Sequence, residues 1–205
     1  MYRPKQFNQP NVVLMTELMT QNPFATMLSN SPESGLTAEQ LPFMVSQEGD
    51  DSIVLRAHVA KANPVWKALQ NTPDVLVVFK GVDSYISPNW YPSKKVNSKV
   101  VPTWNYSAVH AKGRAELIHD AQWILSLLND LTDQQERDQD QPWAVSDAPQ
   151  EFIDSLAKAV VGIRIVVDEL TAKDKLSQNQ SAENRHGVKA GLKASGNEMF
   201  SLIKV

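Results

Sequence analysis

The sequence predicts a mostly β protein, an antiparallel β-barrel with helices packed against its outside. Segments typical of strands outnumber the long helical segments, and the two kinds do not alternate in the regular β-α-β order of a parallel doubly wound sheet. Hydrophobic residues make up 42% of the 205 residues and charged residues 21%, which is typical of a globular chain with a substantial core.

The first half of the chain is expected to begin with a capped helix and to continue into strands. Asn11 can cap a helix whose apolar residues recur every three or four positions. Asn63 and Pro64 favour the start of a second helix, because asparagine caps and proline fits the first turn. The expected elements in order are a helix over 12–19, a strand over 24–29, a solvent loop over 30–40, a hairpin of strands 41–45 and 52–57 around a turn at 47–51, and a helix over 63–69.

The second half is expected to contain the longest strand and two further helices. An uninterrupted apolar run over 75–79 is typical of a strand buried on both faces, and Lys80-Gly81 indicates a turn after it. The remaining expected elements are a strand over 101–118, a helix capped by Asp120 that frays into the polar run 133–141, a helix opened by Pro149, and a last strand around 163–167. We expect a barrel domain over 1–180 and a loosely attached polar helical tail over 181–205.

Several function classes find no support in the residues. The four histidines are far apart, there is no cysteine, and no glycine-rich phosphate loop or nucleophile elbow occurs. Hence no metal site is expected and no catalytic residue is assigned. A formal net charge of −3 argues against a protein that coats nucleic acid or an anionic membrane. Because no apolar run approaches the roughly 20 residues that cross a bilayer and no signal-like segment opens the chain, we expect a cytoplasmic protein.

The most suggestive polar segment is 56–64, where a strand is expected to run into a helix. A helix N-terminus offers unpaired N–H groups and the positive end of a dipole, which suit a phosphate. Lys61 can add a charge, and His58 and Asn63 can add hydrogen-bond donors. The plainer alternative is that Asn63 only caps the helix while Lys61 is solvated, and these residues alone leave both open.

A second segment, 101–110, combines aromatic and amide side chains on one strand. Alternation places Thr103, Asn105, Ser107 and Val109 on one face and Trp104, Tyr106, Ala108 and His110 on the other. A flat heterocycle needs apolar surface on its face and donors and acceptors at its edge, and this strand offers both. Aromatics that fill the barrel core are an equal alternative. The stiff aromatic loop over 85–92 suits an interface or a pocket wall. The segment over 175–179 is either a set of hydrogen-bonding residues or a turn.

Taken in order, these segments resemble the PaiB-type family of FMN-binding split-barrel proteins. The matching stretches are Met1–Pro4, Asn22–Thr26, Ala60–Trp66, Tyr85–Pro92, Lys99–His110, Asp147–Pro149, Val161-Gly162 and Lys175–Asn179. Since they follow the family's order along most of the chain, the series is far more specific than any one stretch.

The resemblance implies an antiparallel split barrel of the pyridoxamine-phosphate-oxidase-like type, which forms a homodimer with FMN near the subunit interface. It implies that the FMN phosphate lies where a strand runs into a short helix, here over 58–63, and that the strand over 104–107 lies beside the flavin ring. The residues expected to bind the cofactor are Thr26, His58, Lys61, Asn63, Trp104, Asn105, Tyr106, Ser107, Gln178 and Asn179.

The chain departs from the family pattern at several positions. Gln40 stands where members usually carry His, and Ala57 stands where they carry Gly. Lys61 replaces an Arg, which loses bidentate recognition of a phosphate. Asp174 and Gln180 replace a Trp and the final Arg of the family's last motif. Weaker binding or retention of FMN is the expected consequence.

The resemblance leaves more than one function open. The family's label is a negative transcriptional regulator, so a flavin-binding regulatory protein is the principal hypothesis. Direct DNA binding has weak support, because no helix-turn-helix with a basic face occurs. Arg185, Lys189 and Lys193, spaced four apart, are the best DNA-contact candidates. A flavin-dependent oxidoreductase of the same barrel class is the alternative, and a binder of haem or another tetrapyrrole is a third hypothesis.

Overall fold

The fold is described from a computed structural model, in which residues 1–49 and 52–205 are described. The strands are β1 (Asn8–Gln9), β2 (Phe24–Ser31), β3 (Gly35–Pro42), β4 (Met44–Glu48), β5 (Ser52–Ala60), β6 (Asp74–Ile86), β7 (Thr103–Ile118) and β8 (Val160–Lys175). The helices are α1 (Val12–Gln21), α2 (Val65–Asn71), α3 (Lys94–Asn97), α4 (Ala121–Glu136), α5 (Gln150–Lys158) and α6 (Ala182–Ala194), with 3-10 turns η1 (Lys5–Phe7), η2 (Pro88–Trp90), η3 (Val145–Asp147) and η4 (Glu198–Leu202). The turn expected at 47–51 lies partly outside the described residues.

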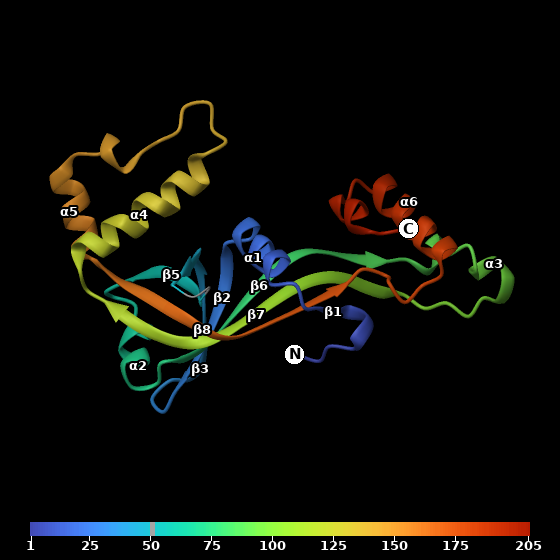
Figure 1. The fold of residues 1–205 in the computed structure, drawn as a ribbon, viewed down its shortest axis with the longest axis horizontal. Coiled ribbons are helices and arrows are strands. Elements are labelled where there is room, and N and C mark those ends of the chain that lie inside the picture. Colours follow the sequence, from blue (N-terminus) through green and yellow to red (C-terminus); the bar gives the residue numbers. More distant parts are fainter. Residues whose placement is uncertain (50–51) are drawn as a thin grey trace. The chain divides into compact units, whose positions relative to one another are not determined.

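The strands of the described chain belong to one sheet. Its order is β3-β2-β6-β7-β8-β5-β4, and β1 pairs with β8. The pairs β1–β8, β2–β3, β2–β6, β4–β5 and β5–β8 are antiparallel, which confirms the expected fold class. The longest strands are β6, β7 and β8, which the ribbon shows as the extended green, yellow-green and orange arrows (Figure 1).

Two compact units divide the chain, and each is described by itself. Unit 1 consists of Met1–Met19, Lys80–His110 and Thr171–Val205. Unit 2 consists of Thr20–Phe79 and Ala111–Leu170. Strands β6, β7 and β8 contribute residues to both units. The division of the chain into a barrel domain over 1–180 and a tail over 181–205 stays a prediction.

Unit 2 contains two β-hairpins and the helices α2, α4 and α5. The β4–β5 hairpin confirms that a hairpin lies here and that its second strand begins at Ser52. The first strand, expected over 41–45, is instead Met44–Glu48, because Leu41 and Pro42 end β3 and pair with β2. The solvent loop expected over 30–40 is wrong, because β3 begins at Gly35 and pairs with β2 through Pro42. As the terminal strand of the sheet, β3 leaves most of its residues exposed or half-buried, so its sequence lacks an apolar alternation.

Strand β6 corrects two expectations. The turn expected at Lys80-Gly81 does not occur, and the strand continues to Ile86. Within 75–79 the odd-numbered residues are buried and the even-numbered ones are half-buried, so only one face of the strand is fully covered. A β-carbon at Gly81 would lie 3.3 Å from Leu18 Cδ1. Glycine here allows a close approach of α1 and does not reverse the chain.

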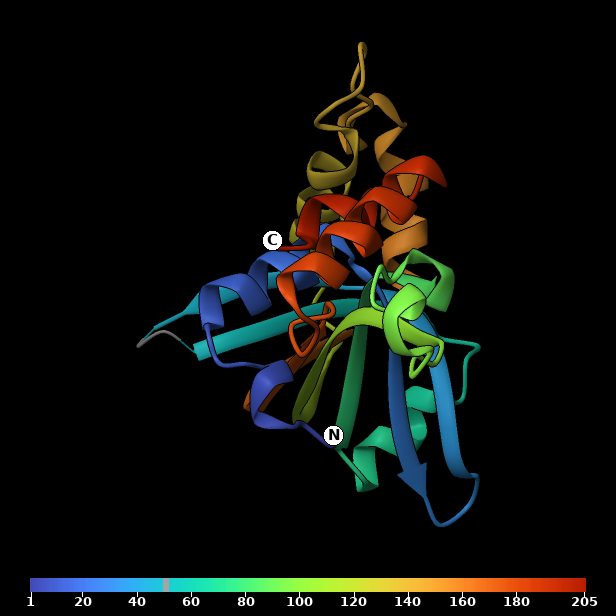
Figure 2. The same cartoon turned by 90° about the vertical axis from the view of Figure 1, so that its right-hand side faces the viewer.

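The C-terminal segment of unit 1 is a docked helix, which corrects the expectation of a loosely attached tail. Helix α6 lies against the loop that carries η2 (Figure 2). Their shared core contains Ile86, Tyr91, Val188, Leu192, Met199 and Ile203, packed against a partly buried Trp90. Added β-carbons at Gly187 and Gly191 would lie 1.9 Å from the Trp90 main-chain oxygen and 2.3 Å from its ring. Two glycines four residues apart therefore let the indole lie directly on the helix.

Predicted helix caps are confirmed where the sequence carries them. The side-chain amide oxygen of Asn11, Oδ1, accepts the Val13 N–H at 2.9 Å. Asp120 Oδ1 accepts the Trp123 N–H at 2.8 Å. Each side chain satisfies a donor that the first helical turn leaves unpaired. No helix among the described residues is long and apolar enough to cross a bilayer.

Candidate functional site

The first candidate cluster lies in unit 2, where β5 runs into α2. Asn63 Oδ1 accepts the Val65 N–H at 2.9 Å, and Asn63 Nδ2 donates to Glu39 Oε2 at 3.1 Å. The asparagine therefore caps the helix, as expected, and also ties its start to β3. Because α2 is only seven residues long, its dipole adds little to any anion site.

Lys61 is held by its backbone while its side chain is exposed. The Lys61 N–H donates to the Ala159 oxygen at 2.8 Å, and its own carbonyl accepts from Trp66 Nε1 at 2.9 Å. Among the residues that the structure describes, no carboxylate forms an ion pair with the Lys61 ammonium. The turn presents a fixed backbone and a free positive charge, as a phosphate contact requires.

His58 lies on β5 directly before this turn and is largely buried. Its Nδ1 has no hydrogen-bond partner in the described structure, and burial lowers the pKa of the imidazole. Arg56, two residues earlier and so on the same strand face, pairs with Asp130 of α4 at 2.8 Å. His58 is therefore neutral near pH 7 and can offer a donor or an acceptor, but not a second positive charge.

Thr26, which was expected to bind the cofactor with this cluster, lies on the β2–β3 pair. Gln40 lies opposite Thr26 in the ladder, and Gln40 Nε2 donates to Thr26 Oγ1 at 2.8 Å. The next residue along β3, Glu39, is the one that Asn63 contacts. Because successive residues of a strand point to opposite sides, Thr26 and Gln40 lie on one face of the β2–β3 pair, and Glu39 and Asn63 lie on the other. The structure therefore does not bring Thr26 together with Asn63.

The second candidate cluster lies in unit 1, on β7. Asn105 and Ser107 face the buried side of the strand, whereas Trp104 on the other side is 55% exposed. A ligand lying on one face of β7 therefore meets only one of these two sets of side chains. The Trp104 ring packs edge-on against the ring of Tyr85, with 6.2 Å between centroids, and both rings remain about half exposed.

Asn105 forms a buried polar pair with the segment that follows β8. Its Nδ2 donates to Ser177 Oγ at 2.9 Å, while its Oδ1 is buried without a partner among the described residues. Ser177 is itself buried and has a positive φ of 63°. Gln178 clamps the same turn, since its Oε1 accepts the Leu176 N–H at 2.7 Å. Asn179 is exposed.

Two lysines at the end of β8 belong to this region. Lys173 was not expected as a site residue, and Lys175 was expected only as part of the segment 175–179. Lys173 is only 9% exposed, and its Nζ lies 5.3 Å from the centroid of the Tyr106 ring. The Lys175 ammonium donates to Thr103 Oγ1. The sequence feature that could have indicated them is the Lys-x-Lys spacing, which places both side chains on one face of a strand.

Each unit, taken by itself, carries groups of a kind that a flavin mononucleotide needs. A phosphate requires cationic donors that are not already neutralised, and Lys61 in unit 2 and Lys175 in unit 1 have this character. A flavin ring requires an exposed flat apolar surface, which Trp104 and Tyr85 provide.

Comparison with known proteins gives the family of this chain. Residues 1–169 match the model of the family described as "Putative FMN-binding domain". The chain is also 32% identical over 181 residues to Protease synthase and sporulation protein PAI 2 of Bacillus subtilis, which covers 88% of this chain and 84% of that protein. The chain belongs to the PaiB-type family of FMN-binding proteins. The expected cofactor, FMN, is confirmed by the family to which the chain belongs.

Other relatives of this PaiB-type protein extend to fungi. An uncharacterized protein of Saccharomyces cerevisiae is 41% identical over 108 residues, covering 52% of this chain and 64% of that protein. Among solved structures, a conserved hypothetical protein from Mycobacterium tuberculosis has a TM-score of 0.62 at 13% identity, covering 88% of this chain and 94% of that chain. An FAD and heme binding protein from Mycobacterium smegmatis has a TM-score of 0.60 at 16% identity, covering 90% and 80%. These likenesses confirm the split-barrel fold.

Proposed function

We propose that this PaiB-type protein binds FMN and regulates gene expression without itself binding an operator tightly. The observation that carries the proposal is the similarity to the Bacillus subtilis protein along 88% of this chain, because that protein's name refers to sporulation. FMN is then the ligand through which the protein senses or transmits a signal, and a protein partner or small molecule carries the effect to DNA.

Charge supports the indirect route. Non-specific affinity for DNA comes mainly from lysine and arginine that neutralise phosphates, and here 20 basic residues accompany 23 acidic ones. Of the stripe spaced four apart on α6, Lys189 Nζ donates to the Ile203 carbonyl at 3.2 Å, and Arg185 is half-buried. Only Lys193 is exposed, which is too little charge for a DNA-binding face.

Anisotropy titration of the purified protein against promoter DNA at moderate salt tests the regulatory proposal. We expect weak binding without sequence preference, and little change when Lys193 is replaced by alanine. Tight, salt-sensitive and sequence-selective binding, lost when Arg185, Lys189 and Lys193 are neutralised together, would overturn the indirect route.

The phosphate of FMN is proposed to lie at the β5–α2 turn, with Lys61 as its charged contact and His58 and Asn63 beside it. Losing a charge-assisted phosphate contact costs about 1.5–3 kcal/mol. Lys61→Ala should therefore weaken FMN binding roughly ten- to hundredfold. Lys67→Ala is the matched control, because Lys67 is an exposed lysine of α2. Equal FMN affinity of Lys61→Ala and the parent would show that this assignment is wrong.

The flavin ring is proposed to lie against the face of β7 that carries Trp104 and Tyr106. Asn105 and Ser107 lie on the opposite, buried side, where Asn105 holds the segment that carries Gln178 and Asn179 through its bond to Ser177. Stacking quenches tryptophan fluorescence, so FMN should quench the parent more than Trp104→Phe. Trp143→Phe is the control, because Trp143 is exposed to a similar degree in unit 2. Equal quenching of the parent and Trp104→Phe would remove β7 from the proposal.

A homodimer is also proposed, but its basis differs from the one that the sequence suggested. The Trp90-Tyr91 loop is covered by the chain's own helix α6 and is not left in water. Exposed apolar side chains occur elsewhere, with Phe24 67% and Leu36 73% exposed on the β2–β3 hairpin. They lie toward opposite ends of that hairpin, and exposed apolar side chains of this kind suit association. Sedimentation that detects only monomer at micromolar concentration would count against the dimer.

The alternative is a flavin-dependent oxidoreductase. It is favoured by the fold shared with the Mycobacterium smegmatis protein that binds FAD and heme, at a TM-score of 0.60. Bound FMN supplies hydride and single-electron transfer, while the protein supplies binding and orientation. Turnover of NADH or NADPH by the FMN-loaded protein, above that of free FMN, would favour this alternative.

A further inference from the structure

The two lysines at the end of β8 form an unusual charge cluster in unit 1. Lys173 is 9% exposed and Lys175 is half-buried. Burial is the largest cause of the lowered pKa of Lys175; Tyr106 acts to raise that pKa, and the charge of Lys173 acts to lower it. Two like charges in a sheltered place are unfavourable unless something compensates them.

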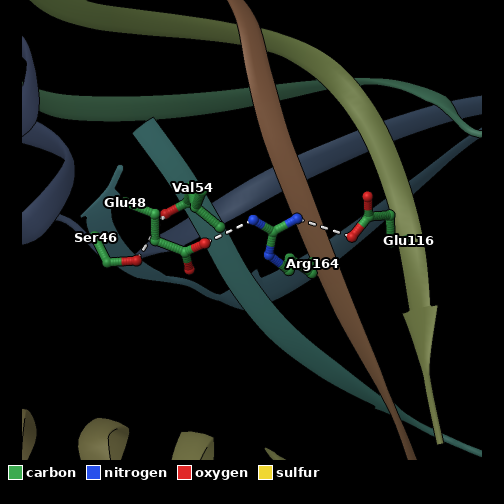
Figure 3. Close-up of polar contacts among 5 residues, drawn as sticks. All are labelled: Ser46, Glu48, Val54, Glu116 and Arg164. Atoms are coloured by element: carbon green, nitrogen blue, oxygen red, sulfur yellow. Dashed lines mark hydrogen bonds and ion pairs between the residues drawn. The ribbon is translucent and has the colours of Figure 1, made fainter. Parts of the chain in front are cut away.

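No carboxylate in the described structure compensates this cluster. Asp174, which lies between the two lysines, accepts instead from Gln9 Nε2 at 2.8 Å. Successive residues of a strand point to opposite sides, so its carboxylate faces away from both lysines. By contrast, the buried and half-buried arginines of unit 2 pair with carboxylates, as Arg164 does with Glu48 and Glu116 (Figure 3).

The groups that do surround the lysines are neutral and suit an anionic ligand. The Lys173 ammonium lies 5.3 Å from the Tyr106 ring and 5.8 Å from the Tyr2 ring, and the Lys175 ammonium donates to the Thr103 hydroxyl. Each ammonium has three donors, so several remain for a ligand. Tyr2 is 84% exposed, so the side of the cluster that Tyr2 covers is open to a ligand from solvent.

We propose that Lys173 and Lys175 form an oxyanion site whose ligand is a phosphate group, with Thr103 and the Tyr106 ring as its neutral walls. Two ammonium groups match the charge of a phosphate better than that of a carboxylate. Because the proposed function places the FMN phosphate at Lys61, the phosphate here is that of a separate phosphorylated small molecule, and capture of the FMN phosphate is the outcome that would move the FMN assignment from Lys61 to this site. The lowered pKa of Lys175 means that binding weakens as the pH rises through that pKa, below the range of an ordinary lysine.

The test begins with calorimetric titration of inorganic phosphate into flavin-free protein at constant ionic strength. Lys175→Met keeps the apolar stem and removes the charge, so it should bind phosphate at least tenfold more weakly, and Lys175→Arg should restore binding. Lys80→Met is the matched control, because Lys80 is an exposed lysine of the same unit, paired with Asp83. Thermal unfolding of each variant checks that it is folded.

A second arm compares FMN with riboflavin, which lacks the phosphate. If phosphate competes with FMN but not with riboflavin, and Lys175→Met reduces the preference for FMN, the site takes the phosphate of the flavin. If phosphate binds beside FMN and Lys175→Met removes only phosphate, the site takes a separate molecule. Parent-like phosphate binding and parent-like flavin preference in both Lys173→Met and Lys175→Met would overturn the proposal. The first arm needs no flavin, so its failure is distinct from a failure to bind FMN.

Discussion

Replacing Gly187 by alanine tests whether α6 is docked as the structure describes. A β-carbon there would lie 1.9 Å from the main-chain oxygen of Trp90, so helix and loop must separate. Overpacking of this kind costs typically 1–3 kcal/mol, and a backbone obstacle places it at the upper end. Alanine in place of glycine gains about 1 kcal/mol of helix propensity. The net expectation is a loss of about 2 kcal/mol of docking stability.

Hydrogen exchange of the α6 amides, followed by mass spectrometry, measures this loss locally. The amides near Val188 and Leu192, which are buried in the docked helix, should exchange about 30-fold faster in Gly187→Ala. Ala190→Gly is the control, because Ala190 is an exposed residue of the same helix and reports propensity alone. The reasoning is refuted if Gly187→Ala slows exchange, since propensity would then be the only effect and the contact with Trp90 would be absent.

Three further predictions concern stability. Ser98→Gly should stabilise the protein by about 0.5–1 kcal/mol in urea unfolding, because Ser98 holds a positive φ of 54° after α3. Burial lowers the pKa of His58 in the folded protein. Its contribution to the free energy of unfolding is therefore intact above about pH 6.5, the pKa of an unfolded histidine, and is lost as the pH falls through the folded pKa. His58→Gln should flatten the pH dependence of the free energy of unfolding in that window. Arg164→Met should destabilise the protein by about 1 kcal/mol, because it removes the guanidinium that pairs with Glu48 and Glu116. The loss should be smaller in 1 M salt, which screens ion pairs, and an equal loss at high salt would argue against an ionic origin.

Local signals in the sequence were enough to predict the elements that depend on neighbouring residues. Asn11 and Asp120 cap helices because their side chains accept from N–H groups two or three residues away, a contact that the sequence itself specifies. The alternation along β7 was predictable for the same reason, since residue spacing alone decides which face a side chain takes.

Elements whose pattern depends on distant partners were not predictable. Strand β3 is held by pairing with β2, and its exposed position at the end of the sheet requires no apolar face. Gly81 indicated a turn because glycine permits one, but in the structure it permits the close packing of Leu18. In both cases the same residue type serves two purposes, and only the tertiary neighbour decides between them.

The role of the aromatic loop over 85–92 also depends on a distant neighbour. Two large aromatics in a stiff loop suit an interface, and the sequence offers no reason to pair them with a glycine-containing helix about one hundred positions later. In the structure that pairing buries Tyr91 and covers Trp90, so this surface is used inside one chain. Lys173 illustrates the opposite case, since a lysine in a strand ordinarily indicates a solvated surface. Only the packing of Tyr106 and Tyr2 around it, with no carboxylate among the described neighbours, marks it as a candidate for ligand binding. Lys173 is thus a candidate because the fold leaves it without a carboxylate partner among the described residues, and the sequence pattern alone does not record that arrangement.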